Sequence, residues 1–545
     1  MPSSEAAVQA VSGLMEAHGR QHGVPERLGL DVASVCAGVV AAQAALAARL
    51  ATLRGMRVSR VETSVVEASL LLLAHHITYA TCGDDWCLPA DGDGAGPPFA
   101  TLDGSWVEIE ALTTESWHEF WTRVGAVDVN LDTSSLLFAL RYTTARCHLP
   151  AELNNALARL TLEEVTTIAD QSGIALRRLR SVEDVTADAS LPRVPWSFRR
   201  GVGHSHGARA PRSAPTIDAP LAGIRVVEAT SRLQGPLAGL LLRMLGADVI
   251  KVEPPGGDPG RIAPPRAGDD GAFYVTYNHD KQPVELDLNS ASGRETLAEL
   301  IASADVFLHN WRSSRADQLG LDADTLLARH PSLVWAHASG WGSAASSSAD
   351  VATEYLVQAH TACGAALHPV DEPPFPTLLT IVDTMGGLIA CEAILAALVQ
   401  RELGGSGCRV ETSLLSAAMT LQQEGSRTTP RGARPSWHAF DRPLAAADGW
   451  ILVSATDGDS MDRALAVCGL PGRAAIAADA RPRIADRVQG TTADEWITRF
   501  AARDVSAVRV CTDLATLETS GHTASLLRRG PGGCAVPAAP WHFTA

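Results

Sequence analysis

The stretch that decides the fold is residues 224–253, IRVVEATSRLQGPLAGLLLRMLGADVIKVE. It begins with a short apolar strand pattern, and Pro236 then marks the first turn of a helix whose apolar residues continue at helical spacing to Leu245. Gly246 ends this helix, and Asp248–Glu253 is a second strand pattern. Strand, helix and strand within about 30 residues predict a βαβ unit with parallel strands.

The same alternation continues beyond this unit. Further strands are predicted at 284–288, 305–309 and 333–337, and helices at 293–302 and 386–398. A turn at Asp448-Gly449 opens a strand of a smaller α+β domain. Because ligands bind beyond the carboxyl ends of parallel strands, we expect Glu253, Asn310 and the loop Gly340–Gly342 to surround one crevice.

Part of this second half is also present near the start of the chain. Residues 5–64 match residues 354–413 without a gap, and the run RVETS occurs at both 60–64 and 409–413. The βαβ unit has no counterpart before Glu5, so only the second copy is expected to hold a complete site. Glu5, the match of Glu354, is expected to be inert.

These patterns predict the domain organisation. Residues 1–200 are a truncated repeat with a helical segment and a small domain but no nucleotide unit, and residues 201–219, rich in Gly, Pro, Ser and Arg, are a linker. Residues 220–545 are the complete copy, with a large domain at about 220–425, a small domain at about 440–510 and a C-terminal return. The predicted fold class is α/β, with a Rossmann-like parallel-sheet large domain, a smaller α+β domain and the N-terminal truncated duplicate.

Composition excludes several function classes. The net charge of −16 over 545 residues argues against nucleic acid as the main partner. No uninterrupted apolar run reaches the roughly eighteen residues of a membrane span, and no secretory signal is visible, so neither a membrane partner nor export is expected. The ten cysteines include no CxxC pair, which favours reduced thiols and a cytoplasmic location. His204 and His206 have no nearby carboxylate or thiolate, so no metal site is predicted.

The basic residues are nearly all arginine. The only lysines are Lys251 and Lys281, and both lie within the motif-bearing segment. They are therefore candidate anion ligands, although each would also fit as an exposed cation at a strand end.

Many short motifs in order resemble those of the class III CoA-transferases, the carnitine dehydratase and bile-acid-inducible group that includes the α-methylacyl-CoA racemases. They include Gly235-Pro236, residues 245–254 (LGADVIKVEP), Gly257-Asp258, residues 310–312 (NWR), residues 319–321 (LGL) and residues 339–342 (SGWG). The resemblance covers about 220–545 continuously, and the repeated half extends it to roughly 5–200.

The resemblance implies a covalent mechanism. Transferases of this family use an aspartate nucleophile about a dozen residues after the Gly-aromatic-Gly loop, and that position is Glu354 here. A carboxylate there would attack an acyl-CoA thioester, and N–H groups of the loop Gly340–Gly342 would stabilise the oxyanion. The racemase branch has a histidine before this position and an aspartate about thirty residues later; here these positions hold Thr353 and Asp383. Two-base racemisation is therefore not expected, and Asp383 would shape the acyl pocket or cap a helix.

The resemblance also implies the ligands and the assembly. The nucleotide of CoA would lie near Lys251, Lys281, Asn310 and Trp311, with acyl-CoA as a substrate and no tightly bound cofactor. Family members form interlocked dimers, so we expect a homodimer or, with residues 1–200 as a built-in partner, an intramolecular pseudo-dimer. The first hypothesis is transfer of CoA between an acyl-CoA and a carboxylic acid through Glu354. The alternatives are a CoA-dependent isomerase, racemase, lyase or cyclase, and a non-catalytic CoA-binding or scaffold protein.

Overall fold

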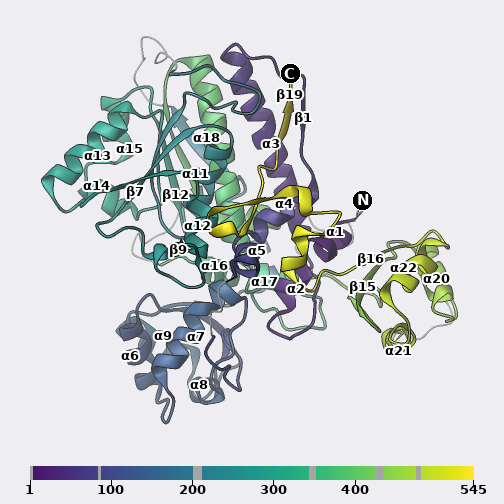
Figure 1. Cartoon of the computed structure of the whole chain (residues 1–545). Coiled ribbons are helices and arrows are strands. Elements are labelled where there is room, and N and C mark those ends of the chain that lie inside the picture. Colours follow the sequence, from purple (N-terminus) through teal and green to yellow (C-terminus); the bar gives the residue numbers. More distant parts are fainter. Residues whose placement is uncertain (1–3, 84–87, 201–211, 343–350, 424–433, 474–479) are drawn as a thin grey trace.

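The computed structural model describes residues 4–83, 88–200, 212–342, 351–423, 434–473 and 480–545. Figure 1 shows a central body of sheet and helices from which two smaller lobes project. The predicted linker is described from residue 212 onward, and His204 and His206 lie outside the described residues.

The central body contains a seven-stranded sheet in the order β10-β7-β6-β11-β12-β13-β5. Six strands run parallel, and β5 is added antiparallel to β13 at one edge. The strands are β5 (Trp196–Arg200), β6 (Arg225–Ala229), β7 (Asp248–Glu253), β10 (Gln282–Glu285), β11 (Val306–His309), β12 (Val334–Ser339) and β13 (Cys408–Ser413). The predicted large parallel sheet with helices is therefore confirmed, with the strand expected at 284–288 starting two residues earlier. β5 was not predicted.

The strand order reverses beside β6. β7 and β10 extend the sheet on one side of β6, and β11, β12 and β13 extend it on the other. The chain segments that follow β6 and β11 turn to opposite faces of the sheet. This opens a crevice at the carboxyl ends of the two strands.

Helices follow these strands along the chain, and several of them pack directly against the sheet. They are α11 (Gln234–Met244), α12 (Ala272–Asn278), α13 (Ala291–Ser303), α14 (Ser313–Gln318), α15 (Ala323–Arg329), α16 (Glu354–His360), α17 (Cys363–Leu367), α18 (Ile381–Gly404) and α19 (Leu414–Leu421). α11 approaches α18 closely because α18 carries Gly386 and Gly387: a Cβ on Gly387 would lie 2.8 Å from the carbonyl oxygen of Gln234. These glycines therefore seat the start of α11 at the carboxyl edge of the sheet.

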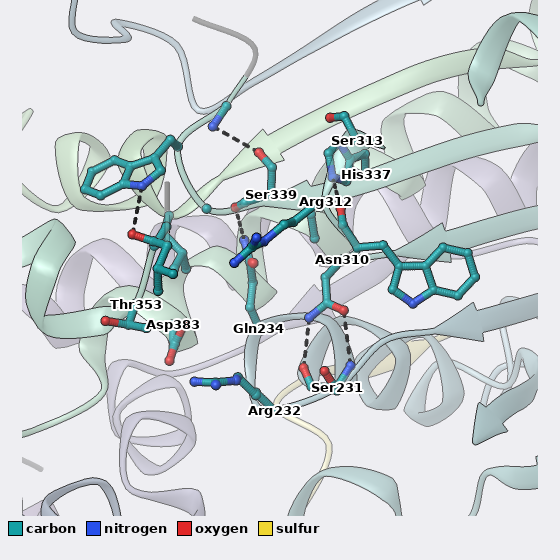
Figure 2. A pocket seen from close by; sticks show the side chains of 18 of the residues that line it. Ser231, Arg232, Gln234, Asn310, Arg312, Ser313, His337, Ser339, Thr353 and Asp383 are labelled. Carbon is teal, nitrogen blue, oxygen red and sulfur yellow. Dashed lines mark hydrogen bonds between the residues drawn. The ribbon is translucent and has the colours of Figure 1, made fainter. Parts of the chain in front are cut away.

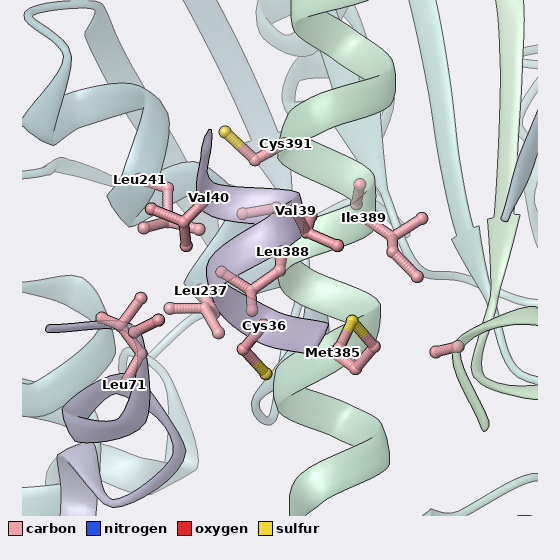
Figure 3. Packing of buried hydrophobic residues seen from close by; sticks show 14 of the residues in the cluster. Cys36, Val39, Val40, Leu71, Leu237, Leu241, Met385, Leu388, Ile389 and Cys391 are labelled. Atoms are coloured by element: carbon pink, nitrogen blue, oxygen red, sulfur yellow. The ribbon is translucent and has the colours of Figure 1, made fainter. Parts of the chain in front are cut away.

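The core continues from α18 to α3 (Val32–Leu53), a helix of the N-terminal segment. Figure 3 shows Cys36, Val39 and Val40 of α3 packed with Met385, Leu388 and Ile389 of α18 and with Leu237 and Leu241 of α11. The Gln43 side chain of α3 also donates a hydrogen bond of 2.7 Å to the Leu388 carbonyl oxygen. Burial of one such leucine contributes about 2–5 kcal/mol, so this helix pair is a main source of stability.

α3 and α18 are long and apolar enough, by length and composition, to cross a membrane. The expectation that no segment passes this test was wrong, because it considered only uninterrupted apolar runs. In the structure α18 is largely buried, and α3 buries one face against it. Core helices of this kind pass the same test.

The N-terminal segment supplies the rest of this helical layer and the first lobe. Its layer holds α1 (Glu5–Ser12), α2 (Leu14–Gly19), α3, β1 (Arg60–Glu62), α4 (Val65–Leu72) and α5 (Ala74–Thr81). The first lobe holds β2 (Phe99–Ala100), β3 (Trp106–Glu110), α6 (Thr114–Val124), α7 (Leu131–Thr144), α8 (Ala151–Leu157), α9 (Leu162–Ser172), β4 (Ala175–Arg178) and α10 (Val182–Ala187). Its strands β2, β3 and β4 form one sheet over a separate core.

The second lobe has a similar plan. It holds β14 (Leu444–Ala446), β15 (Gly449–Ser454), α20 (Gly458–Val467), α21 (Arg481–Val488), α22 (Ala493–Ala501) and β16 (Ser506–Arg509). Its strands form a three-stranded sheet, and its helices share a separate core with that sheet. The remaining elements are β8 (Arg266–Ala267), β9 (Asp270–Gly271), β17 (Leu527–Arg529), β18 (Ala535–Pro537), β19 (His542–Thr544), and the 3-10 helices η1 (Pro259–Arg261), η2 (Leu514–Glu518), η3 (Ala524–Leu526) and η4 (Pro531–Gly533).

Two strand pairs join residues 4–200 to the rest of the chain. β5 pairs antiparallel with β13, with Phe198 opposite Val410, and β19 pairs antiparallel with β1, with Phe543 opposite Val61. β13 contains the RVETS run of residues 409–413, and β1 contains the first three residues of the matching run at 60–64. The end of each half therefore pairs with the repeated strand of the other half.

Candidate functional site

A pocket of about 460 Å³ opens at the carboxyl edge of the sheet (Figure 2). Its walls come from the segments that follow β6, β11, β12 and β13, from the start of α18 and from one residue of the first lobe. The lining residues are Leu112, Ser231, Arg232, Gln234, Asn310, Trp311, Arg312, Ser313, His337, Ala338, Ser339, Gly340, Trp341, Gly342, Val351, Ala352, Thr353, Asp383, Arg409, Glu411 and Leu414. Five predicted site residues are among them: Asn310, Trp311, Gly340, Gly342 and Asp383.

Asn310 joins the ends of β6 and β11. Its side-chain amide donates to the Ser231 carbonyl oxygen at 2.8 Å, and its side-chain oxygen accepts from the Ser231 N–H at 3.2 Å. Figure 2 shows these two bonds side by side. Asn310, which the sequence predicts to bind the nucleotide, thus also fixes the loop after β6, because both polar groups of its side-chain amide bind that loop.

The loop Gly340–Gly342 is tightly held after β12. The Gly342 N–H donates to Ser339 Oγ at 3.1 Å, and Gly342 has a left-handed φ of 79°. A Cβ on Gly340 would lie 2.1 Å from the Cβ of Ala352, so this position requires glycine. The Gly342 N–H is already bonded within the loop, which makes it a poor candidate for the expected oxyanion contact.

Two stacked histidines lie at the ends of β11 and β12. The rings of His309 and His337 are 4.6 Å apart and nearly parallel, and the two residues are register partners in the sheet. A ring nitrogen of His337, Nε2, bonds the Trp311 carbonyl oxygen at 2.8 Å. Burial lowers the pKa of both imidazoles, so they are neutral at physiological pH.

Asp383 and Glu354 meet at the start of α18, but only Asp383 lines the pocket. The Glu354 side chain is fully buried and caps α18: its oxygens accept the N–H groups of Val382 at 2.9 Å and Asp383 at 2.6 Å. The amide of Gln358 donates a third bond at 2.8 Å. Both carboxylates of the expected catalytic pair are thus brought together, with Glu354 behind Asp383.

The charges of this pair are strongly coupled to their surroundings. Burial and the neighbouring Asp383 carboxylate raise the pKa of Glu354 well above its usual range, against the opposing effect of its three N–H donors. Burial also raises the pKa of Asp383, and the Arg232 guanidinium opposes that shift. The site therefore disfavours full ionisation of both Asp383 and Glu354. A single carboxylate is sufficient for attack on a neutral thioester.

The N-terminal segment contains a corresponding set of hydrogen bonds around Glu5, to which the Ser34 hydroxyl adds a further bond of 2.6 Å. The Glu5 oxygens accept from the N–H groups of Ala33 at 3.0 Å and Ser34 at 2.8 Å, at the start of α3, and from the amide of Gln9 at 3.0 Å. Ser34 takes the position that Asp383 has in the second set. Glu5 lies in a different pocket, which faces the second lobe and contains none of the seven sheet strands among its described lining residues.

The two lysines, which the sequence predicts to lie near the nucleotide of CoA, are not among the residues that line this pocket. Both are buried around Glu228 at the end of β6: Lys281 Nζ lies 2.8 Å from Glu228 Oε2, and Lys251 Nζ lies 3.6 Å from Glu228 Oε1. Lys251 also donates to the Thr230 carbonyl oxygen at 3.0 Å. Their role in the structure is to neutralise a buried carboxylate and to hold the segment after β6. Glu253 is likewise bound to Arg261 and Tyr274, outside the pocket.

The first lobe contributes directly to this pocket. Leu112 follows β3 and lies in the lining, and the Arg177 guanidinium of β4 lies 5.0 Å from the ring of Trp341. The Arg180 N–H donates to the Ala359 carbonyl oxygen of α16 at 3.0 Å. The pocket therefore lies between the large sheet and the lobe of the N-terminal segment.

A buried charge network in the first lobe supports α16 from behind. Arg141 pairs with Glu108 at 2.9 Å and with Glu110 at 3.3 Å, and its guanidinium lies 4.4 Å from the ring of Tyr355. Tyr355 follows Glu354 directly. The lobe thus positions the helix that carries the expected nucleophile.

Sequence reasoning missed three kinds of lining residue. His337 ends a predicted strand, as His309 does, and that shared ending was a readable signal. Arg232 interrupts the turn between a strand and an apolar helix, which was a second signal. Leu112 carries no signal in the sequence, because only tertiary packing brings it to the pocket.

Comparisons with known proteins show which family this chain belongs to. A sequence model of the CoA-transferase family III matches residues 1–211 and 221–545. A probable fatty acyl-CoA transferase of Mycobacterium tuberculosis is 30% identical over 289 residues, covering 48% of this chain and 71% of the relative. A succinate–glutarate CoA-transferase of Agrobacterium fabrum is 30% identical over 297 residues, covering 50% of this chain and 73% of the relative. The human succinyl-CoA:glutarate CoA-transferase is 27% identical, covering 52% and 67%.

Solved structures show the same fold. The orthorhombic crystal structure of Rv3272 from M. tuberculosis has a TM-score of 0.50 at 26% identity, covering 59% of this chain and 92% of that chain. A CaiB/BaiF family protein from Brucella suis has a TM-score of 0.53 at 23% identity, with the same coverage of 59% and 92%. With the family match extending over both halves, the chain belongs to CoA-transferase family III.

Proposed function

We propose that this enzyme transfers CoA from an acyl-CoA to a carboxylic acid in the pocket at the carboxyl edge of the sheet. The observation that carries the proposal is the meeting of Asn310, the Gly340–Gly342 loop and Asp383 at one opening, with Glu354 directly behind Asp383. CoA thioesters and carboxylates are the substrates of CoA-transferases, and relatives named for glutarate and mesaconate transfer support such acceptors.

The covalent step is assigned to Glu354. Its carboxylate oxygen attacks the thioester carbonyl carbon, the C–S bond breaks, and the CoA thiolate leaves a mixed anhydride. The thiolate attacks the glutamyl carbonyl, which releases the donor acid and leaves a glutamyl-CoA thioester. The acceptor carboxylate then attacks that thioester, and the returning thiolate forms the new acyl-CoA and frees Glu354.

Glu354 must turn toward the pocket for this reaction. In the resting geometry its Oε2 accepts a single hydrogen bond from the described residues, from the Asp383 N–H, whereas its Oε1 accepts two. Oε2 is therefore the oxygen that attacks. Asp383, already at the pocket surface, holds the space between Glu354 and the substrate.

Trapping tests this assignment. Incubating the protein with succinyl-CoA and hydroxylamine is expected to inactivate it and to convert one carboxylate to a hydroxamate that mass spectrometry locates at Glu354. Modification of Asp383 would transfer the nucleophile role to that residue. Modification of neither, with active transfer, would contradict the covalent route.

A second candidate function is proton transfer on an acyl-CoA, as in an isomerase or lyase. It is favoured by Asp383, which lines the pocket and whose pKa is raised by burial, as suits a general base. Thr353, also in the lining, has no ionisable group to act as the second base of a racemase. Deuterium incorporation from solvent at the acyl α-carbon without CoA exchange would favour this alternative over transfer.

We also propose that residues 1–200 are a truncated duplicate that acts as a built-in partner for residues 220–545. This interpretation is supported by the element starts: α1, α3 and α4 begin 349 positions before α16, α18 and α19. It is also supported by the matching hydrogen bonds of Glu5 and Glu354, and by the two exchanged strand pairs. One chain would thereby build a single complete site without a second copy.

The third possibility, a scaffold without catalysis, is separated by ligand binding. If the site binds CoA, the bound ligand stabilises the native state. Saturating CoA is therefore expected to raise the melting temperature. An unchanged melting temperature, together with no transfer, would support the scaffold role.

A further inference from the structure

Arg232 stands out in the pocket because its backbone is strained. It has a left-handed φ of 66°, which a residue with a long side chain rarely adopts. The neighbours hold it there: Ser231 is fixed by Asn310, and Leu233 is buried in the core. Strain of this kind costs about 1–3 kcal/mol and persists where the side chain is needed for function.

The side chain is free to take a ligand. Among the arginines of the lining, Arg409 is paired with Glu411 at 2.6 Å. Arg232 makes no hydrogen bond or ion pair with any residue that the structure describes, and its guanidinium is exposed. Figure 2 shows this side chain extending toward the end of the pocket that holds Asp383 and Thr353. Its charge acts on Asp383 strongly enough to oppose the rise in the pKa of that carboxyl.

We infer that Arg232 binds the remote carboxylate of a dicarboxylic substrate, so that the acids exchanged at this site carry two carboxyl groups. The inference rests on the proposed transferase function. A guanidinium binds a carboxylate through two parallel hydrogen bonds and engages the lone pairs that would otherwise attack. The carboxylate held by Arg232 is therefore not the one that reacts, and the reacting carboxyl group is at the other end of the ligand.

The position of Arg232 suits this arrangement. It lies at the Asp383 end of the pocket, which is where the acyl group must reach Glu354, whereas Asn310 and Trp311 lie at the segment after β11. A ligand with one carboxylate would leave the Arg232 charge without a partner.

The experiment compares two acceptors with succinyl-CoA as a fixed donor. In the wild-type protein, kcat/KM for glutarate is expected to exceed that for butyrate by about a hundredfold. Arg232→Gln is expected to lower this ratio about thirtyfold or more, and Arg232→Lys to retain part of it. Equal use of the two acceptors by the wild type, or an unchanged ratio in Arg232→Gln, would overturn the inference.

Two further variants separate recognition from folding. Arg232→Gly removes the side chain and relieves the left-handed strain, so its melting temperature is expected to rise while the glutarate preference is lost. Arg312→Gln neutralises another arginine of the same lining and is expected to leave the ratio unchanged. Loss of the ratio in Arg312→Gln alone would assign the remote carboxylate to Arg312 and overturn the inference.

Failure of the transferase proposal itself has a different result. If the wild type transfers CoA to neither acceptor, glutarate binding is measured directly by the fluorescence of the lining tryptophans Trp311 and Trp341. Glutarate is then expected to bind at least tenfold more tightly to the wild type than to Arg232→Gln. Equal binding to both proteins would overturn the assignment of Arg232.

Discussion

The two capped helices of the molecule share their bonding but differ in their surroundings. Glu5 caps α3 and Glu354 caps α18, and each accepts hydrogen bonds from two backbone N–H groups and a glutamine amide. Beside Glu354 stand Asp383 and the loops of the large sheet; beside Glu5 stand Ser34 and the second lobe. The glutamate cap therefore serves to start each helix. A candidate site forms only at Glu354, where the large sheet and a second acidic residue, Asp383, lie beside the cap.

Removing the N-terminal half is the strongest test of this comparison. Deleting residues 1–200 is expected to abolish solubility or activity, because the deletion uncovers the apolar face of α18 and removes both β5 and the partner of β19. Soluble yield and CoA transfer measure the effect. A fully active fragment of residues 220–545 would refute the built-in partner.

A cut in the linker is the matched control. A protease site inserted within residues 201–211 leaves every described contact in place, so the two pieces are expected to elute together from a gel-filtration column after cleavage. Separation of the pieces without denaturant would show that the exchanged strands and the α3–α18 contact do not hold the halves.

Exchanging the residues beside the two caps, Asp383 and Ser34, is expected to have the second largest effect on activity. Asp383→Ser gives the pocket the residue that lies beside Glu5, and CoA transfer is expected to fall about a hundredfold or more because the pocket loses its surface carboxylate. Ser34→Asp, the reverse change, is expected to leave transfer unaltered. Full activity in Asp383→Ser would remove Asp383 from the site.

Replacing each capping glutamate by alanine is expected to lower the free energy of unfolding by different amounts. Glu354→Ala leaves the buried N–H groups of Val382 and Asp383 without an acceptor and removes one bond of the Gln358 amide, so the free energy of unfolding is expected to fall by about 3–5 kcal/mol. Glu5→Ala is expected to cost about 1–2 kcal/mol, because the Ser34 N–H can bond water instead. Urea unfolding of both variants tests the order, and a larger loss for Glu5→Ala would contradict it.

The smallest expected effect is the pH dependence that Asp383 adds beside the Glu354 cap, since its counterpart Ser34 has no carboxyl group to titrate. Burial raises the pKa of Asp383 from 3.8 to about 6, so between these values the native state binds more protons than the unfolded state. The stability contribution of this carboxyl group is therefore present at low pH and decreases as pH rises through 6. Compared with the wild type, Asp383→Asn is expected to gain about 1 kcal/mol between pH 4 and pH 7, a small value because the pocket side is open to solvent.

Urea unfolding at pH 4, 5.5 and 7 measures this difference, with Ser34→Asn as the control in the other half. A flat or falling difference for Asp383→Asn would show that the carboxyl group titrates in its usual range.

The sequence predicted the sheet well because its strands are apolar runs separated by helical periodicity. The predicted strands at 248–253 and 305–309 match β7 and β11 to within one residue. It could not predict β5, because Trp196–Arg200 is mostly exposed and is a strand only through pairing with β13. The composition of these five residues does not show that they pair with a strand about 200 residues later in the chain.

The site was predicted in part for a similar reason. Asn310 and the Gly340–Gly342 loop follow directly from strand ends, so their meeting was readable. Lys251 and Lys281 were assigned to CoA because the sequence does not show Glu228 between them. Leu112 belongs to the site only through the packing of the first lobe.

The pairing of β1 with β19 has a consequence for synthesis of the chain on the ribosome. β1 spans Arg60–Glu62, whereas its partner β19 spans His542–Thr544, after the whole of the large sheet in sequence. The edge of β1 therefore stays unpaired while the residues between the two strands are made. Until β19 has been made, that edge is exposed to chaperones and to other nascent chains.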